Sequence, residues 1–434
     1  MERKEDIGRM HTAGITIDFE YGELWRGIHR RNPLSFKKPY SFTVYKDRDV
    51  YMAEDWRGRI RFEDDNASEV IENAVDSLPN GGLVFLKEGI FDFSKTVELK
   101  GKVFIQGCIG SVIRAVSENI TLFKATERYW GIFNCYLDGQ SKTGTIAIES
   151  DTGADDGWII NCVIKNFGSH ALYLRNLRSH IRGCDIADVG GDGIRLEYGS
   201  DSFIVNNLIS ASGSGIVLDF TGVCVISGNF IHDIGSFGVN GYNGAHRIII
   251  KGNRFWVVDS LAVWFRYYSS DYNGGDNIVV ANEFRDINYG NHADTETIRL
   301  ESCENNIISL NRFYGSNPVA DVYERGTSNN NIITYNRVVN GIVVVGSRTV
   351  VRHNLGYPTE NSGVATFSGD GSTTEFKIEH GLVSTPSKYV VSPLTPDADA
   401  SRTITVDDTY ITITFDTAPP SGTDNVKFGW WAEV

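Results

Sequence analysis

The sequence predicts an all-β protein, most of it a parallel β-helix, on three observations. A Cys or Asn recurs ten times between residues 135 and 354, at intervals of 18 to 29 residues. A large apolar residue follows two positions later in all but the last case, where Gly356 stands. Short apolar segments such as Ile204-Val205 precede these positions. A period of about two dozen residues is typical of stacked repeats, in which each coil buries its apolar side against its neighbours. The recurring positions are Cys135, Cys162, Cys184, Asn207, Asn229, Asn253, Asn282, Asn311, Asn336 and Asn354.

The recurring Asn residues predict a polar ladder along the axis of the solenoid. Hydrogen-bonded strands lie about 4.8 Å apart, so Asn side chains of successive coils are expected to bond to one another. Cys135, Cys162 and Cys184 take the same turn position in three earlier coils, and we expect buried free thiols there. A single disulfide between neighbouring coils is the alternative. The Cys and His spacings do not indicate a zinc site.

Composition excludes several classes of partner. The chain has 434 residues, 41% of them hydrophobic, with 45 Gly, and can therefore bury a long core with many turns. A net charge of -14 argues against a nucleic-acid partner, because phosphate binding needs a basic stripe. No apolar run is long enough to insert into a membrane. The first 30 residues lack the apolar block of a secretory signal.

The chain divides into three expected domains. Residues 1–65 lack the repeat and are expected to form a β-rich head, with a hairpin over residues 42–52. Asn66 and Glu69 have the spacing of a capping box, and apolar residues then recur at helical intervals until a Pro-Asn-Gly-Gly turn at residues 79–82. This helix is expected to cover the open end of a β-helix spanning residues 66–357. Residues 358–434 alternate between short strands and turn residues, which predicts a small β-sandwich.

The segment that follows the helix resembles a known superfamily. Residues 81–86, Gly89-Ile90-Phe91 and residues 103–107 look like the opening of the pectate-lyase-like right-handed parallel β-helix superfamily, and the resemblance spans residues 66–357. Within it the chain is most similar to viral tailspike and capsule-depolymerase proteins. That similarity implies a polysaccharide partner, a homotrimer and an extracellular or virion-associated location. The superfamily includes lyases, hydrolases, epimerases and non-catalytic adhesins, so the fold alone does not choose an activity.

A second strand in each coil predicts two outward-facing rows of side chains. Because alternate residues of a strand point to opposite faces, aligning these strands gives a first row and, two residues later, a second row. The first row reads Tyr173, Arg195, Val217, Asn240, Trp264, Arg299 and Tyr323. The second row reads Arg175, Glu197, Asp219, Tyr242, Arg266, Glu301 and Arg325.

These rows favour a glycan-binding face, because aromatic rings stack on sugars and arginine forks hold carboxylates or hydroxyls. The alternative is an ordinary solvated surface. The longest intervals add residues 267–272 and 289–294 beside this face, and such inserts often build a binding wall. The candidate substrate-binding residues are therefore Tyr268 and His292 together with Tyr173, Arg175, Arg195, Asn240, Tyr242, Trp264, Arg266, Arg299, Glu301 and Tyr323.

Glu197 and Asp219 are the candidate catalytic acids. Their 22-residue separation equals the local period, which places them about 5 Å apart on neighbouring coils. Like charges so close are expected to raise the pKa of one acid, which suits a glycosidase. Asp192 is a third candidate. The alternative is that Arg175 and Arg195 neutralise both acids in a surface ion network.

Two other functions stay open. Elimination from a uronate polymer would use Arg266 or Arg299 to neutralise the carboxylate and His292, Tyr242, Tyr268 or Tyr289 to move protons. A non-catalytic adhesin would bind the glycan without cleaving it. We expect no cofactor and no metal, although Asp271, Asp276 and Asp294 offer oxygen ligands for calcium.

Overall fold

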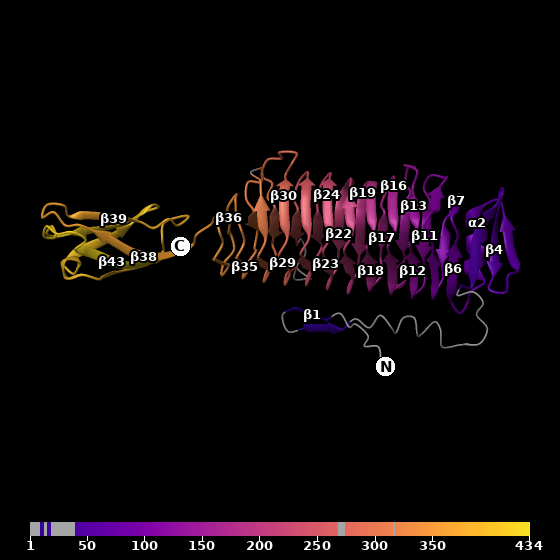
Figure 1. The fold of residues 1–434 in the computed structure, drawn as a ribbon, viewed down its shortest axis with the longest axis horizontal. Coiled ribbons are helices and arrows are strands. Elements are labelled where there is room, and N and C mark those ends of the chain that lie inside the picture. The colour runs from indigo at the N-terminus through magenta and orange to yellow at the C-terminus, as the bar shows by residue number, and fades with distance from the viewer. Residues whose placement is uncertain (1–8, 13–14, 19–39, 268–273, 316) are drawn as a thin grey trace, which may run out of the picture.

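The computed structural model describes residues 9–12, 15–18, 40–267, 274–315 and 317–434. Its described part is a long row of parallel strands followed by a small β module at the C-terminal end (Figure 1). The predicted all-β solenoid is therefore confirmed. A short antiparallel pair, β1 (Arg9–Thr12) and β2 (Ile15–Asp18), precedes it. No helix in the described ranges has the length and apolarity that a membrane crossing would need.

One side of the solenoid is a 15-stranded sheet. Twelve of its strands come from successive coils, and each pairs in parallel with the next. They are β6 (Gly82–Leu86), β9 (Val103–Gln106), β12 (Trp130–Phe133), β15 (Gly157–Ile160), β18 (Ser179–Arg182), β20 (Phe203–Val205), β23 (Val225–Ser227), β26 (Ile249–Lys251), β29 (Ile278–Val280), β32 (Ile307–Ser309), β35 (Ile332–Thr334) and β37 (Val350–Arg352).

The rest of the wall is a 20-stranded sheet made of two parallel ladders. The long strand β19 (Asp185–Glu197) belongs to both, through its first and second halves. The first ladder also holds β7 (Gly89–Phe93), β10 (Ser111–Ala115), β13 (Tyr136–Asp138), β16 (Val163–Phe167), β21 (Leu208–Ser210), β24 (Phe230–Ile234), β27 (Arg254–Val258), β30 (Glu283–Ile287) and β33 (Arg312–Tyr314). The second holds β8 (Val97–Leu99), β11 (Thr121–Ala125), β14 (Ile146–Ser150), β17 (Leu172–Leu174), β22 (Ser212–Asp219), β25 (Val239–Tyr242), β28 (Val263–Arg266), β31 (Ile298–Glu301), β34 (Val322–Arg325) and β36 (Ile342–Val343).

The core lies inside the solenoid and consists of stacked rows of like side chains. In the 15-stranded sheet Ile204, Ile226 and Ile250 lie in register, and each is fully buried. Aromatic rings stack in the same way, since the Phe284 ring centroid lies 5.0 Å from that of Phe255 and 5.2 Å from that of Phe313. Because each coil buries its apolar row only against its neighbours, the core is continuous along the axis.

The predicted Asn ladder is present. The Oδ1 of Asn253 accepts from the backbone N–H of Asn229 at 2.9 Å and from its Nδ2 at 3.0 Å, and the same pattern runs from Asn207 to Asn354. Below it, Cys135, Cys162 and Cys184 are buried free thiols, as expected. The sequence analysis missed a second ladder, formed by Asn277, Asn306 and Asn331.

The N-terminal end is closed by a meander and a helix. The antiparallel strands β3 (Phe42–Asp47), β4 (Val50–Asp55) and β5 (Ile60–Asp64) continue the 15-stranded sheet, because β3 pairs in parallel with β6. Helix α2 (Ala67–Asp76) begins at Asn66, whose side chain caps the N–H of Ser68. The predicted capping box is wrong in its second half, since the N–H of Asn66 donates to Asp64 while Glu69 pairs with Lys95.

The C-terminal module consists of two three-stranded antiparallel sheets that share a small core. One sheet holds β38 (Glu360–Phe367), β43 (Val426–Glu433) and β40 (Lys388–Pro393), and the other β39 (Glu375–Glu379), β42 (Tyr410–Phe415) and β41 (Arg402–Val406). A 3₁₀ turn, η1 (Pro396–Ala398), joins β40 to β41. Phe415 and Phe428 pack between the sheets with ring centroids 6.1 Å apart. The predicted small β-sandwich is therefore seen.

Candidate functional site

The outer side of the second ladder carries the two predicted rows, and we call this surface the polar face. The strand register agrees with the sequence alignment: Glu197 lies opposite Asp219, and Trp264 lies opposite Arg299. The apolar residues that flank the first row, such as Ile194 and Leu196 beside Arg195, are fully buried. Most side chains of the two rows are partly exposed, whereas Val217, Asn240 and Asp219 are buried.

Asp219 is held by three donors. Arg195 Nη2 lies 3.0 Å from Asp219 Oδ2, the Tyr242 hydroxyl donates to the same oxygen at 2.8 Å, and Asn243 Nδ2 donates to Oδ1 at 2.9 Å. All three partners donate, which fits an ionised carboxylate. Burial and the hydrogen bond to Asp219 raise the pKa of Tyr242 to about 12, so its hydroxyl keeps its proton at neutral pH.

Glu197 is more open. Its Oε2 accepts a hydrogen bond from the Tyr173 hydroxyl, and its side chain stays partly exposed. Burial, together with this hydrogen bond, raises the pKa of Tyr173. The two acids therefore differ in surroundings: Asp219 is saturated with donors, whereas Glu197 has one tyrosine partner and access to solvent.

Asp192 joins the same network from the preceding part of β19. Its Oδ2 lies 3.3 Å from Arg195 Nη1 and 3.5 Å from His170 Nδ1. The backbone N–H of Asp192 donates to that Nδ1 at 3.0 Å, so this ring nitrogen is the acceptor. Burial lowers the pKa of His170 despite the nearby Asp192, and the imidazole is therefore neutral at pH 7. The sequence analysis missed His170 and Asn243.

Arg195 is the centre of the network, and Arg175 lies outside it. Burial opposes the charge of Arg195, but Tyr242 and Asp192 outweigh burial, and the pKa of Arg195 is raised. Arg175 instead pairs with Glu149 at 2.9 Å and with Asp151 at 3.1 Å on the preceding coil. The expectation that both arginines neutralise the acid pair therefore holds for Arg195 at Asp219 and is wrong for Arg175.

A second cluster surrounds Trp264. Its ring centroid lies 4.0 Å from the guanidinium carbon of Arg266 and 5.3 Å from that of Arg299, and its Nε1 donates to Glu301 at 3.1 Å. Such contacts fix the indole in place. A sugar that stacked on this ring would compete with the guanidinium of Arg266 for one ring face.

Glu296 organises the end of the polar face. It is fully buried, and it accepts from Arg299 Nε at 2.7 Å and from Arg325 Nη2 at 3.0 Å. Arg325 also lies over the ring of Tyr323, with 5.0 Å between its guanidinium carbon and the ring centroid. The sequence analysis did not single out Glu296, because an acid at the end of a loop gives no sign that two arginines from different coils will enclose it.

The predicted loop walls are partly described. Residues 288–297 form a loop that projects beyond the coils next to β30 (Figure 1). In this loop the backbone N–H of His292 donates to Asn288 at 2.8 Å, and its Nε2 lies 2.9 Å from Asp259. His292 therefore pairs with an acid between β27 and β28, away from the Glu197 pair. Tyr268 and Asp271 lie outside the described residues.

Asn240 has an unsatisfied acceptor. The residue is 6% exposed, and its Oδ1 has no hydrogen-bond partner. A buried orphan acceptor costs about 1–3 kcal/mol. Asn240 lies between Val217 and Trp264 in the first row, so a donor that reached it would come through the polar face. A water or a sugar hydroxyl is a donor of the right kind.

The described part of the chain holds no group of three or more His, Cys, Asp or Glu side chains arranged to bind a metal ion. The polar face carries carboxylates, tyrosine hydroxyls, a neutral histidine and paired guanidinium groups. Such a set suits binding of hydroxyl-rich ligands and proton transfer between a carboxyl group and a bound oxygen.

Comparison with known proteins identifies the fold. The family described as right handed beta helix region matches residues 119–284 and, in a second match, 180–332. A search of curated proteins finds no match. Among solved structures, the Dettilon tailspike protein is 14% identical with a TM-score of 0.52, over 84% of this chain and 90% of that one.

Two sugar-active enzymes have similar folds. The A-module of the mannuronan C-5 epimerase AlgE4 from Azotobacter vinelandii is 18% identical with a TM-score of 0.50, over 67% of this chain and 96% of that one. The DFA-IIIase from Arthrobacter chlorophenolicus A6, in complex with GF2, is 13% identical with a TM-score of 0.51, over 66% and 94%. At these identities the likeness shows the fold alone, and together with the family match it confirms the predicted right-handed parallel β-helix.

Proposed function

Because the chain carries a right-handed β-helix region, a fold found in tailspikes and sugar-active enzymes, we propose that it binds a polysaccharide along the polar face and cleaves it by hydrolysis. The observation that carries this proposal is the pair formed by Glu197 and Asp219 on neighbouring strands, in two different environments. Tyr173, Arg195 and Tyr242 surround the pair, and Trp264 and Arg299 extend the same face over later coils.

The two acids would take different roles. Glu197, which is partly exposed and has one hydroxyl partner, gives a proton to the leaving oxygen as the glycosidic bond breaks. Asp219, held by three donors, attacks the anomeric carbon, and water activated by Glu197 then releases the sugar from Asp219. Neighbouring strands are about 4.8 Å apart. That spacing is nearer the roughly 5–5.5 Å between the acids of retaining glycosidases than the roughly 6.5–9.5 Å of inverting ones. The substrate-binding roles of the remaining face residues are part of this proposal.

Hydrolysis is preferred to elimination because Arg299, one of the two candidate cations, is already paired with a protein carboxylate. Elimination needs a cation to neutralise the uronate carboxylate, yet Arg299 is already committed to the buried Glu296. A uronate would have to displace a protein carboxylate there.

A second candidate is a glycan-binding adhesin without catalysis. The observation that favours it is the saturation of Asp219 by Arg195, Tyr242 and Asn243, which leaves this oxygen pair little freedom to react. A virion-associated location and a homotrimer, as in tailspike-type proteins, belong to either form of the proposal.

One experiment separates these functions. The protein is incubated with a panel of polysaccharides, and reducing ends, ultraviolet absorbance of unsaturated uronates and binding are each measured. New reducing ends without the absorbance support hydrolysis, both signals together support elimination, and binding with neither supports an adhesin.

The acid pair is then tested by substitution. Glu197→Gln and Asp219→Asn should each abolish cleavage while the thermal unfolding midpoint changes little. Glu379→Gln, at an exposed acid on β39 of the C-terminal module and outside the polar face, is the matched control and should cleave normally. Full activity in both site variants would remove this assignment.

A further inference from the structure

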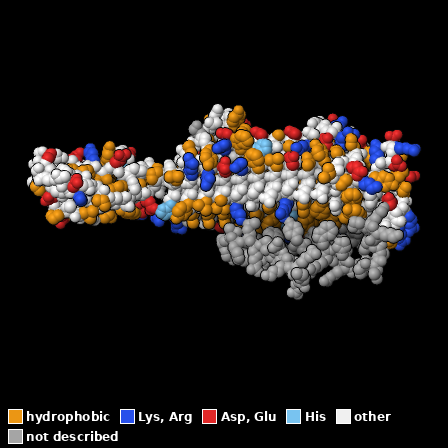
Figure 2. Space-filling view, viewed as in Figure 1, with side chains coloured by type: hydrophobic (Ala, Val, Ile, Leu, Met, Phe, Trp, Pro, Cys, Tyr) orange, Lys and Arg blue, Asp and Glu red, His pale blue; other side chains and the backbone are white. Residues whose placement is uncertain are grey.

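Exposed arginines gather on the outer side of the first ladder, over its last coils. They are Arg254 on β27, Arg285 on β30, Arg312 on β33 and Arg337 in the following coil. Arg254 Nη2 lies 3.6 Å from Glu283 Oε2. Of the carboxylates that the structure describes, none lies within ion-pair distance of the other three arginines. Figure 2 shows Lys and Arg side chains close together over the coils next to the C-terminal module. This surface is therefore basic, although the chain as a whole has a net charge of -14.

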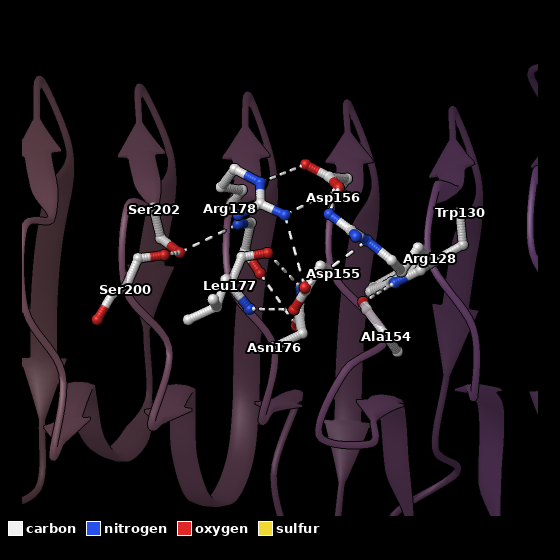
Figure 3. Close-up of polar contacts among 11 residues, drawn as sticks. Arg128, Trp130, Ala154, Asp155, Asp156, Asn176, Leu177, Arg178, Ser200 and Ser202 are labelled. Carbon is white, nitrogen blue, oxygen red and sulfur yellow. Dashed lines mark hydrogen bonds and ion pairs between the residues drawn. The ribbon is translucent and has the colours of Figure 1, made fainter.

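In two other parts of the solenoid, arginines alternate with acids on successive coils. Near the N-terminal end of the first ladder, Arg114 Nε lies 2.6 Å from Asp92 Oδ1. At the entrance to the 15-stranded sheet, Arg178 Nε lies 2.6 Å from one oxygen of Asp156, and Arg128 Nη2 lies 3.1 Å from the other (Figure 3). Charges paired in this way satisfy each other and leave no site for an anion. The last coils of the first ladder are different, because their arginines face one another without intervening acids.

The strand register places two of these like charges side by side. Arg312 and Arg337 lie opposite each other in a parallel bridge. The residues that follow them, Phe313 and Val338, are buried, so both arginine side chains point outward. Paired strands lie about 4.8 Å apart, and like charges directly opposite each other destabilise a sheet. An oxyanion between the two guanidinium groups would replace this repulsion with charge-assisted hydrogen bonds to both.

Aromatic rings complete this surface. The guanidinium carbons of Arg285 and Arg337 lie 5.3 Å and 5.5 Å from the ring centroid of Tyr314. Such cation–π contacts orient a guanidinium group without neutralising its charge. Trp256 is 43% exposed, and its Nε1 donates to Asp286 at 2.8 Å, which fixes the indole. We call this surface the arginine patch, and its members are Arg254, Trp256, Arg285, Arg312, Tyr314 and Arg337.

We propose that the arginine patch binds an acidic glycan, one whose sugars carry carboxylate or phosphate groups. The planar fork of an arginine matches either oxyanion in a bidentate contact. Arg312 and Arg337 hold one oxyanion between them, and the exposed ring of Trp256 stacks on a neighbouring sugar. The arginine patch lies on a different ladder from the polar face, so it binds this ligand independently of the function of that face.

The size of the arginine patch favours a short acidic glycan over a nucleic acid. From β27 to the coil of Arg337 there are three strand-to-strand steps, so at about 4.8 Å per step the patch is about 14 Å long. A nucleic-acid strand carries a charge about every 3.4 Å, and beyond the patch the net charge of -14 repels it. A glycan of a few sugar units contacts the patch alone, where the local arginines act within the Debye length of about 8 Å.

The test is the affinity of the full chain for trisaccharides, measured by calorimetry. Trigalacturonate and phosphorylated maltotriose are the acidic probes, and galactotriose and maltotriose are their neutral counterparts. At least one acidic probe should bind roughly tenfold or more tightly than its counterpart, because one hydrogen bond to a charged group is worth about that factor. The probe that does so identifies the anion as carboxylate or phosphate. Equal affinities within both pairs, or tighter binding of a short single-stranded oligonucleotide, would overturn the proposal.

Substitutions then locate the site. Arg312→Gln combined with Arg337→Gln should weaken binding of the acidic probe roughly 100-fold, since two charged contacts are lost. Arg57→Gln combined with Arg59→Gln is the matched control, because these two exposed arginines lie in the turn between β4 and β5 at the other end of the solenoid. The control removes the same charge and should bind the probe as the wild type does. If the two double variants bind alike, the arginine patch is not the site.

Chemical protection of the wild type keeps the test decisive if the double variant fails to fold. Phenylglyoxal modifies exposed arginines, and mass spectrometry measures the rate at each one. The tight-binding acidic probe should slow modification of Arg285, Arg312 and Arg337 and leave Arg57 unchanged. Unchanged rates at all four would reject the site. Protection confined to Arg195 would place the acidic sugar on the polar face, which supports the proposed function and rejects the arginine patch.

Discussion

Replacing Asn282 with Ala should destabilise the solenoid strongly, because this side chain joins three coils. It is 1% exposed. Its Oδ1 accepts from the N–H of Asn253 at 2.8 Å and from Asn253 Nδ2 at 3.0 Å, and its Nδ2 donates to the carbonyl of Ile250 at 2.9 Å and to Asn311 Oδ1 at 3.1 Å. The substitution removes all four hydrogen bonds, including the one in which Asn282 Oδ1 accepts from the buried backbone N–H of Asn253.

The magnitude follows from those contacts. Asn253 Nδ2 and Asn311 Oδ1 each keep another partner, so they lose about 1 kcal/mol each. The Asn253 N–H and the Ile250 carbonyl add about 1–3 kcal/mol each. The sum is roughly 4–8 kcal/mol, and because repeats contact only their neighbours it should appear mainly as local opening of the coils around Asn282.

Hydrogen exchange measures this opening directly. Since 1.4 kcal/mol is a factor of ten, a loss of about 4 kcal/mol should speed exchange in β26, β29 and β32 by roughly 10³-fold. Asn317→Ala is the control, since Asn317 is exposed and its side chain makes one long hydrogen bond, of 3.5 Å. If both variants exchange alike in these strands, the ladder does not hold the coils together and the reasoning is wrong.

Two further predictions concern the hydroxyl of Tyr242 beside the acid pair and the imidazole of His180 on β18 of the 15-stranded sheet. Tyr242→Phe removes one donor to Asp219, worth about 1 kcal/mol, and should lower cleavage activity roughly fivefold without unfolding the protein. Tyr198→Phe, at an exposed tyrosine, is the control and should keep full activity. Equal activities in the two variants would contradict a role for the Tyr242 hydroxyl. Burial lowers the pKa of His180, so the unfolded chain binds a proton that the folded one rejects, and the free energy of unfolding should fall as pH drops below about 6.5 toward the lowered value. His180→Phe, which keeps the ring stacked against Phe203, should give a shallower loss in acid denaturation; an unchanged pH profile would refute this.

Most of the fold could be predicted from the periodicity, because residues that lie one period apart in the sequence of a solenoid are neighbours in space. Once Asn229, Asn253 and Asn282 are placed over one another, the neighbours of each remaining residue on adjacent coils follow from its distance in sequence to the Asn. Strand alternation then tells whether its side chain points into the core or outward. The rows of the polar face followed from that step. The second ladder of Asn277, Asn306 and Asn331 had the same signal, since its spacings of 29 and 25 equal those of the first ladder five residues on.

The pairing of charged side chains could not be predicted in the same way. A long arginine on one coil can reach acids above it, below it or in an adjacent loop, and the sequence does not say which. Arg175 reaches backward to Glu149 and Asp151 instead of forward to Glu197. Arg299 and Arg325 converge on Glu296, which the period places in a loop. These outcomes depend on rotamers and burial, which the repeat does not constrain.

The geometry of the acid pair depends on the interior of the solenoid more than on the polar face itself. Glu197 belongs to the coil of Cys184 and Asp219 to the coil of Asn207, and the N–H of Cys184 donates to Asn207 Oδ1 at 2.9 Å. This buried bond helps to set the register that places Glu197 opposite Asp219. Because a slip of one residue would turn the acids into the core, the ladder and the paired strands fix their alignment, and the surface side chains remain free to vary with the ligand.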